Sequence, residues 1–380
     1  MNRDRRQHGR AAALGVAAAV VLVVTGGCGS ASSAGHADPP AVHSQRPALT
    51  AAVAAGLLAA FDRSDSAASA SGNIAVLGAD EAPPALDDSI AAVHRAQASH
   101  SPQPTFSHAD PVFAIPGGTP SCFLAAATLH LKGDEIPEYD VSQFIQGPLG
   151  GWQLNLHVLV PSSAEPQLAL IGAQPATSAA AAIPAARRQA LVSQVFARTT
   201  AVAHPDFSLL ASSVVLDQEL GAGWTLYLQA LRAAHMTVSR TLTGVQWSAC
   251  AARAGGSVIA FLTIEAADTI RPLPGGSGVA ELTAQDPDMI GIGQRTTVRG
   301  SSISVSRVEE FLLSVPVSAD APAQILGLVD APVSVSTVPA DPSSASTVPA
   351  DPSSASTVPA GTPSASTVPA GTPSAKATAP

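Results

Sequence analysis

A ten-residue repeat at the C-terminal end limits how much of this chain can enter a folded core. Ser336-Thr337-Val338-Pro339-Ala340 recurs with its first residue at Ser346, Ser356 and Ser366. These units contain too few large apolar groups to offset the entropy of ordering the chain, and they are too short and polar for solenoid repeats. We therefore predict a disordered Ser/Thr/Pro/Ala-rich tail over residues 321–380. O-glycosylation is one role for such a tail, and a repeat without a specific role is the alternative.

The N-terminal residues have the pattern of an export signal. Arginines among the first ten residues precede an apolar stretch over residues 11–24, as in secretory signal peptides. That stretch is shorter than the roughly twenty residues of a transmembrane helix. Val24-Thr25-Gly26-Gly27-Cys28 then resembles a bacterial lipobox, in which the cysteine becomes the lipid-modified first residue of the mature protein. We predict a lipoprotein signal peptide over residues 1–27 and lipidation of Cys28.

The residues around this cysteine also indicate where the protein resides. Thr25 stands where lipoproteins usually have leucine, so an ordinary signal peptide cut after Ala34 or Ala37 is the alternative. Residues 28–48 are rich in small and polar residues and predict a disordered tether. Two acyl chains on one cysteine give stable membrane attachment. We expect an exported protein that is lipid-anchored at the outer face of the cell membrane, with secretion as the alternative.

The signal, Gly26-Gly27-Cys28, the tether and the Ala/Arg-rich body together resemble uncharacterised actinobacterial secreted lipoproteins. The resemblance rests on residues 1–48 and implies a location rather than an activity. After the signal, 15 basic and 27 acidic residues give a formal charge of −12, and so acidic a surface disfavours nucleic acid. As partners we expect the membrane, through the lipid anchor, and either another envelope protein or an apolar ligand.

Hydrophobic periodicity divides the body into two similar halves. In the first half, helical patterns over residues 49–61 and from Asp87 precede extended segments over residues 122–131 and 151–160. In the second half, helical patterns after Pro184 and from Trp224 precede extended segments over residues 257–264 and 301–317. The shared order indicates an internal duplication of one helix-plus-sheet unit.

We therefore predict an α+β fold of two similar halves, each with helices and an antiparallel sheet. The first domain is expected over residues 49–168 and the second over residues 178–320, between disordered flanks. Each half loosely resembles the cystatin-like or nuclear-transport-factor-like folds, in which a helix packs on a curved sheet. One continuous domain is the alternative.

Cys122 and Cys250 remain once Cys28 is assigned to the lipid. An exported protein folds in an oxidising compartment, where such a pair is expected to form a disulfide. The chain-entropy model assigns about 4–5 kcal/mol of stabilisation to a loop of this length. Two buried free thiols are the alternative, because cysteine packs readily as a small hydrophobic residue.

The extended segment over residues 301–317 contains two unexpected charges. By alternation, Arg307 and Glu309 share a face with Ile303, Val305 and Phe311. Buried charges must be paired and hydrogen-bonded, so if the alternation holds, Arg307 and Glu309 form a pair that could line a polar spot in a cavity. The alternative, a bulge or turn near Arg307 that resets the alternation, is the preferred interpretation.

Other polar clusters predict no specific chemistry. Asp286-Pro287-Asp288 lacks the spacing of a calcium loop, and we expect a solvated turn there and at Asp62 and Asp65. Three nearby histidines lack the spacing of a zinc site (His94, His100 and His108). The chain has no Gly-x-Ser-x-Gly, Cys-x-x-Cys or phosphate-loop motif. We therefore expect no metal, no cofactor and no catalytic residue.

Three functional hypotheses follow from these observations. The leading one is an exported, lipid-anchored cell-envelope protein that acts as a non-enzymatic binding or structural module. The second is a carrier of an apolar ligand or lipid, held between the sheet and helix of a half. The third is a hydrolase, which would require titratable groups that converge in a cleft.

Overall fold

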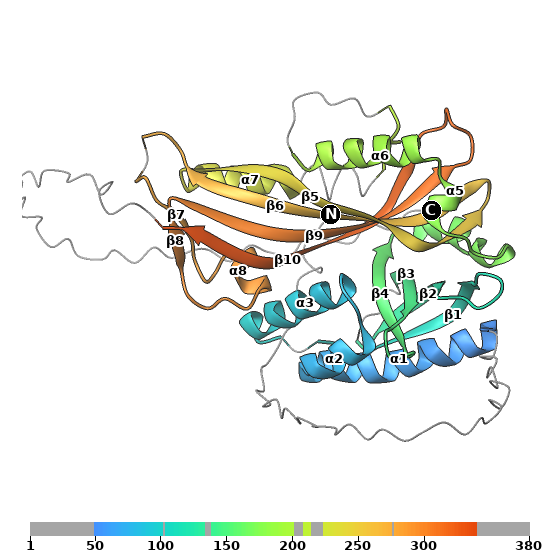
Figure 1. Cartoon of the computed structure of the whole chain (residues 1–380). Coiled ribbons are helices and arrows are strands. Elements are labelled where there is room, and N and C mark those ends of the chain that lie inside the picture. Colours follow the sequence, from blue (N-terminus) through green and yellow to red (C-terminus); the bar gives the residue numbers. More distant parts are fainter. Residues whose placement is uncertain are drawn as a thin grey trace, which may run out of the picture. The chain divides into compact units, whose positions relative to one another are not determined.

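The first half of the body is a set of three helices followed by a four-stranded antiparallel sheet (Figure 1). Thr50 accepts a hydrogen bond from the Val53 amide at the start of the first helix, and Gly72 ends it in a left-handed conformation, so both ends are capped locally. The helices are α1 (Ala51–Ser71), α2 (Ile74–Asp80) and α3 (Ala85–Ser99). The strands, in sheet order, are β1 (Phe106–Ala114), β2 (Cys122–Leu131), β3 (Glu138–Gln146) and β4 (Trp152–Val160).

The second half repeats this order with longer strands. Its helical segments are η1 (Ser162–Ala164), α4 (Glu165–Leu168), η2 (Ile171–Ala173), α5 (Ala179–Ala182), α6 (Ala185–Arg198) and α7 (Gly223–Ala233). The main antiparallel sheet has the order β10-β9-β6-β5, formed by β5 (Met236–Ala254), β6 (Ser257–Pro272), β9 (Ser302–Pro316) and β10 (Gln324–Val338). Between β6 and β9 lie the small pair β7 (Ala280–Leu282) and β8 (Val298–Gly300) and the short helix α8 (Pro287–Gly291).

This computed structural model describes residues 49–101, 103–133, 138–200, 208–213, 223–275 and 277–339. The predicted signal peptide, Cys28 and the tether over residues 28–48 lie outside the described residues. The predicted α+β fold, with helices and antiparallel sheets in both halves, is confirmed. Among the described helices, none is long and apolar enough to cross a membrane.

The hydrophobic core lies in layers on both faces of each sheet. Between the two sheets, Leu124, Val141 and Val158 pack in one cluster with Phe261, Leu312 and Leu326. On its other face, the first sheet packs Phe123 and Phe144 against Leu58 and Phe61 of α1. The second sheet packs Leu262 and Phe311 against Leu191 and Val195 of α6. The order of layers is therefore helix, sheet, sheet, helix.

Covalent and polar links also join the two sheets. Cys122 of β2 and Cys250 of β5 form a disulfide with a Cα–Cα distance of 5.9 Å. Beside it, the Cys250 amide donates to Oε1 of Gln143 (3.0 Å), and Nε2 of Gln143 donates to Oδ1 of Asn155 (2.6 Å). The described residues of the two halves therefore share one hydrophobic cluster and are joined by a covalent bond.

The predicted start of the disordered tail at residue 321 is wrong, because residues 324–338 form β10. This strand pairs with β9 from Gln324 opposite Ser314 to Val338 opposite Ser302. Ala331 is buried and Val335 packs against an apolar cluster. Residues 331–340 match residues 341–350 at seven of ten positions. In the later unit, however, Asp341 replaces Ala331 and Ala345 replaces Val335. The first unit keeps the apolar side chains that hold it in the sheet.

Candidate functional site

A polar cavity lies between the three helices of the first half and the adjoining face of its sheet. Its lining includes Asp65, Glu81, Asp88, His108, Asp140 and His157. Phe61, Phe106 and Leu154 supply apolar surface beside these groups. The space open to water-sized molecules is about 40 Å³, which is enough for roughly three waters or for one small polar group.

His108 of β1 is held between two carboxylates. Its Nδ1 lies 2.6 Å from Oδ1 of Asp62 in α1, and its Nε2 lies 3.1 Å from Oδ2 of Asp140 in β3. The His108 amide also donates to Asp62 (2.8 Å). Burial lowers the pKa of His108, but its hydrogen bonds and ion pairs with Asp140 and Asp62 outweigh that effect and raise the pKa to about 9. The imidazole is therefore a buried cation near neutral pH.

A second histidine completes the row of charges. His157 of β4 has Nε2 at 3.4 Å from Asp88 in α3 and Nδ1 at 3.9 Å from Asp140. Although burial opposes both charges, hydrogen bonds and opposite charges raise the pKa of His157 well above its usual value and hold the pKa of Asp140 well below its own. Ser142 donates to Asp140 (2.5 Å), so this carboxylate is the centre of the row.

Glu81 lines the cavity from the C-terminal end of α2. It is 2 % exposed, and Ser89 of α3 donates to its Oε1 (2.8 Å). Its Oε2 is buried without a hydrogen-bond partner within 3.5 Å. Burial and the charge of Asp65 raise the pKa of Glu81 well above the usual value. The cavity therefore contains a buried acid whose neutral form is favoured by burial and by Asp65, although the charge of His157 opposes that effect.

We expect the His108 cluster to lose stability in alkali. Because the folded pKa of about 9 exceeds the unfolded value of about 6.5, the stabilisation is complete below about pH 6.5 and disappears as the pH rises through about 9. Urea unfolding between about pH 6 and pH 10 should show a steeper loss for the wild type than for His108→Gln. The exposed His130 provides the control, His130→Gln, which should follow the wild type. Parallel profiles for wild type and His108→Gln would contradict this assignment.

The second half contains a separate cluster that includes the predicted Arg307 and Glu309. Both are buried, and β9 pairs with β6 without a break in register. The alternation therefore holds, and no bulge in β9 resets it. The predicted mutual pair is wrong in its partners, since Arg307 pairs with Asp268, Asp288 and Asp330, and Glu309 pairs with Arg240. Strand neighbours and α8 supply carboxylates that the sequence of β9 alone does not reveal.

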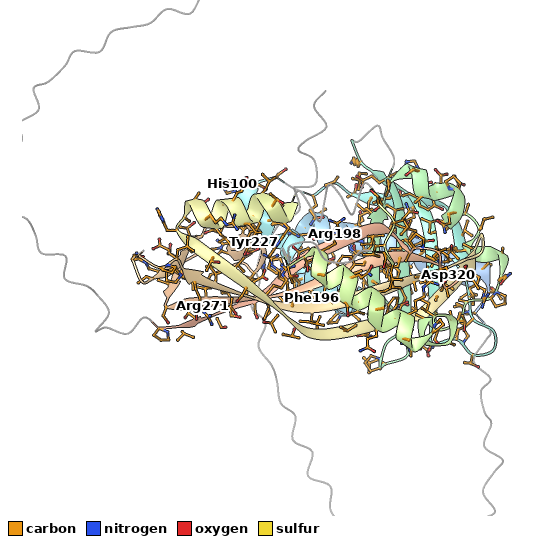
Figure 2. The ribbon with its side chains drawn as sticks, turned by 90° about the horizontal axis from the view of Figure 1, so that it is seen from above. His100, Phe196, Arg198, Tyr227, Arg271 and Asp320 are labelled. Carbon is orange, nitrogen blue, oxygen red and sulfur yellow. A yellow bond between two sulfur atoms is a disulfide. The ribbon has the colours of Figure 1, made fainter. Side chains whose placement is uncertain are left out.

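Arg240 and Arg307 share one carboxylate in this second cluster. Arg240 binds Asp268 through two bonds of 2.7 and 2.9 Å, and Nε of Arg307 donates to the same carboxylate (2.8 Å). From α7, Trp224 lies 4.3 Å from the Arg240 guanidinium and Tyr227 lies 5.6 Å from that of Arg307; Figure 2 labels Tyr227 on this helix. These contacts join α7 and α8 to the second sheet.

Several acids expected in solvated turns are buried instead. Asp62 and Asp65 lie on the inner face of α1, and Asp288 lies in the ion network, each less than 9 % exposed. The helical spacing of Phe61 and Asp65 was a usable signal, because residues four apart share a face. Asn155 of β4 is also buried, beside the break in pairing at Gln143 and Phe144.

The three neighbouring histidines do not come together. His94 makes a hydrogen bond of 2.9 Å with the Gly291 carbonyl, His100 ends α3, and His108 lies in the cavity cluster. Within the described ranges, no group of three or more His, Cys, Asp or Glu side chains is arranged to hold a metal ion. A second hollow lies beside Gln167, Gln324 and Leu326.

Comparison with known proteins yields no relative from which a function could be transferred. No family model matches the chain, and no curated protein matches it significantly.

Proposed function

We propose that this chain is an exported, lipid-anchored protein of the cell envelope that binds a small ligand in the cavity of its first half. The unfilled acceptor of the buried Glu81 is the observation that carries this proposal. A buried carboxyl oxygen without a partner costs free energy, and a ligand that donates a hydrogen bond would remove that cost. The apolar and polar lining together is typical of small-molecule sites.

The contacts in the cavity favour binding over catalysis. Ser142 donates to Asp140 and not to a histidine ring, whereas a serine nucleophile needs a base as its hydrogen-bond partner. Each histidine is held by carboxylates and has a raised pKa, so it is already protonated and cannot serve as a general base near neutral pH. Cys122 and Cys250 form a disulfide with each other, so neither is a free thiol that could act as a nucleophile.

The charged lining also favours a small polar ligand over an apolar one. Four aspartates, Glu81 and two histidines contribute to the cavity and its hydrogen-bonded surroundings. A hydrocarbon chain placed there would desolvate these groups without giving hydrogen bonds in return. The carrier of lipid that the sequence left open is therefore the less favourable proposal for this cavity.

The membrane anchor is tested by replacing Cys28. In an actinobacterial host, Cys28→Ser should remove the lipid and release the protein from the membrane fraction into the medium. Thr25→Leu, which brings the signal closer to the usual lipobox, is the matched control and should stay membrane-bound. Fractionation and immunoblotting measure both variants, and a Cys28→Ser protein that remains in the membrane fraction would contradict the anchor.

The ligand site is tested by filling the cavity. Ala92 of α3 lines it, so Ala92→Phe should exclude any ligand, whereas Ala67→Phe places the same side chain on an exposed position of α1. Native mass spectrometry of the wild type purified from its host should show an added mass of a small molecule. That mass should persist in Ala67→Phe and be absent from Ala92→Phe. A wild-type protein without any added mass, or equal masses in all three, would contradict the proposal.

A further inference from the structure

The two halves present charged clusters on corresponding strands. In the first sheet, the first, third and fourth strands supply His108, Asp140 and His157. In the second sheet, the first, third and fourth strands of the meander supply Arg240, Arg307 and Asp330, and the second strand adds Asp268, which has no charged counterpart in the lining of the first cavity. Each cluster lies where its sheet meets helices, namely α1 and α3 in the first half and α7 in the second. The repeated order of elements makes these clusters counterparts.

The second cluster shows how this arrangement accommodates a guanidinium group. All three nitrogens of the Arg307 guanidinium donate to carboxylates, on Asp268, Asp288 and Asp330. The ring of Tyr227 lies against the same group, which adds a cation–π contact. Arg307 is 6 % exposed, so the chain itself buries a guanidinium among acids and an aromatic ring.

The first cluster has comparable acids and aromatic rings but no arginine among the residues that line it. Its cations are two imidazoles that belong to strands, and both are engaged by Asp62, Asp88 and Asp140. Asp65 and Glu81 lie on the side of α1 and α2, where they interact with each other, with Phe61 and Phe106 beside them. The unfilled oxygen of Glu81 and the open space of about 40 Å³ occur in a cavity without a guanidinium in its lining, although Arg95 of α3 donates to Asp88 from outside the cavity.

We propose that the cavity of the first half binds an organic cation through a guanidinium group, which takes the place that Arg307 takes in the second half. The inference rests on the function proposed above and names the chemical class of the ligand. A guanidinium has four heavy atoms and a planar fork of donors that matches carboxylates. Glu81 and Asp65 would accept its hydrogen bonds, and Phe61 or Phe106 would offer a ring face.

Binding of such a cation is coupled to proton release. Glu81 faces Asp65 from α1, Ser89 and Asp88 from α3 and His157 from β4. Burial and the charge of Asp65 raise the pKa of Glu81 well above the usual value and favour its protonated form. A guanidinium beside it favours the ionised carboxylate, so the proton leaves Glu81 as the cation enters. Affinity should therefore rise with pH across the neutral range, and calorimetry in buffers of different ionisation enthalpy should detect the released proton.

Titration calorimetry of the full chain with methylguanidinium chloride tests the proposal. The wild type should bind methylguanidinium at least about tenfold more tightly than methylammonium, and acetate should not bind. Glu81→Gln keeps the size of the side chain but cannot ionise, and it should weaken binding about tenfold or more, or by about 1.4 kcal/mol. The control is Glu281→Gln, at an exposed pair with Arg299 outside the cavity, which should bind as the wild type does.

The outcomes separate this inference from the function on which it rests. If Ala92→Phe removes a native ligand but methylguanidinium does not bind the wild type, the binding function stands and the guanidinium assignment is overturned. Equal affinity for methylammonium overturns the assignment as well. If Glu81→Gln unfolds, Ala92→Phe serves as the blocked variant and must abolish methylguanidinium binding. Binding that survives in Ala92→Phe places the cation elsewhere and overturns the proposal.

Discussion

Arg307→Met should lower the free energy of unfolding by about 3–5 kcal/mol, the usual cost of removing one member of a buried ion network. The substitution keeps an unbranched side chain but leaves Asp268, Asp288 and Asp330 facing one another with Arg240 as the remaining cation near Asp268. Two of these acids are less than 9 % exposed, so water cannot replace the lost guanidinium. Urea unfolding followed by circular dichroism measures the change.

Arg299→Met provides the matched control for this experiment. Arg299 pairs with Glu281 at 2.6 Å, but its side chain is 68 % exposed. An exposed pair is screened by water and contributes about 0–1 kcal/mol at most, so this variant should unfold close to the wild-type midpoint. A similar loss in both variants, or a loss below about 1 kcal/mol in Arg307→Met, would contradict the prediction that the buried Arg307 network stabilises the fold more than an exposed ion pair does.

Replacing Cys122 and Cys250 together by alanine should cost about 4–5 kcal/mol in the chain-entropy model. The disulfide spans 128 residues and joins the two sheets, so its loss lets the unfolded chain explore many more conformations. Both cysteines are buried, and alanine leaves the surrounding side chains in place at the expense of a small void.

Reductant supplies the internal control for the disulfide. Wild-type protein unfolded in urea with dithiothreitol should approach the stability of the double variant, whereas dithiothreitol should leave the double variant unchanged. Equal stability of the oxidised wild type and the double variant would contradict a stabilising role for the bond. A large effect of reductant on the double variant would point to a cause other than this disulfide.

Local patterns predicted the elements whose burial is one-sided. The alternation over residues 301–317 corresponds to β9, and the helical spacing from residue 49 corresponds to α1, although that helix runs on to Ser71. β3 escaped prediction because buried polar side chains such as Asp140 and Gln143 interrupt its hydrophobic pattern. Such polar groups enter a strand only where partners on other elements satisfy them.

The cavity escaped prediction for a related reason. Its acids and histidines come from α1, α3 and the strands β1, β3 and β4, up to about a hundred residues apart, and none of them forms a short motif. Asp65 and Glu81 resemble surface acids in sequence, and only the packing of α1 and α2 over the sheet buries them. Apart from the helical spacing of Phe61 and Asp65, charge and spacing along the chain therefore carried no signal for this site.

The sequence by itself determined the α+β class, the helical and extended character of the main elements, and the side of β9 that carries Arg307 and Glu309, because these follow from periodicity within a few residues. It also predicts export and lipidation of Cys28, which await their experiment. Only the tertiary structure decided that the first repeat unit belongs to β10 and that Arg307 binds three aspartates rather than Glu309. The physical reason is that burial, and with it the state of a charge, depends on contacts between elements far apart in the chain.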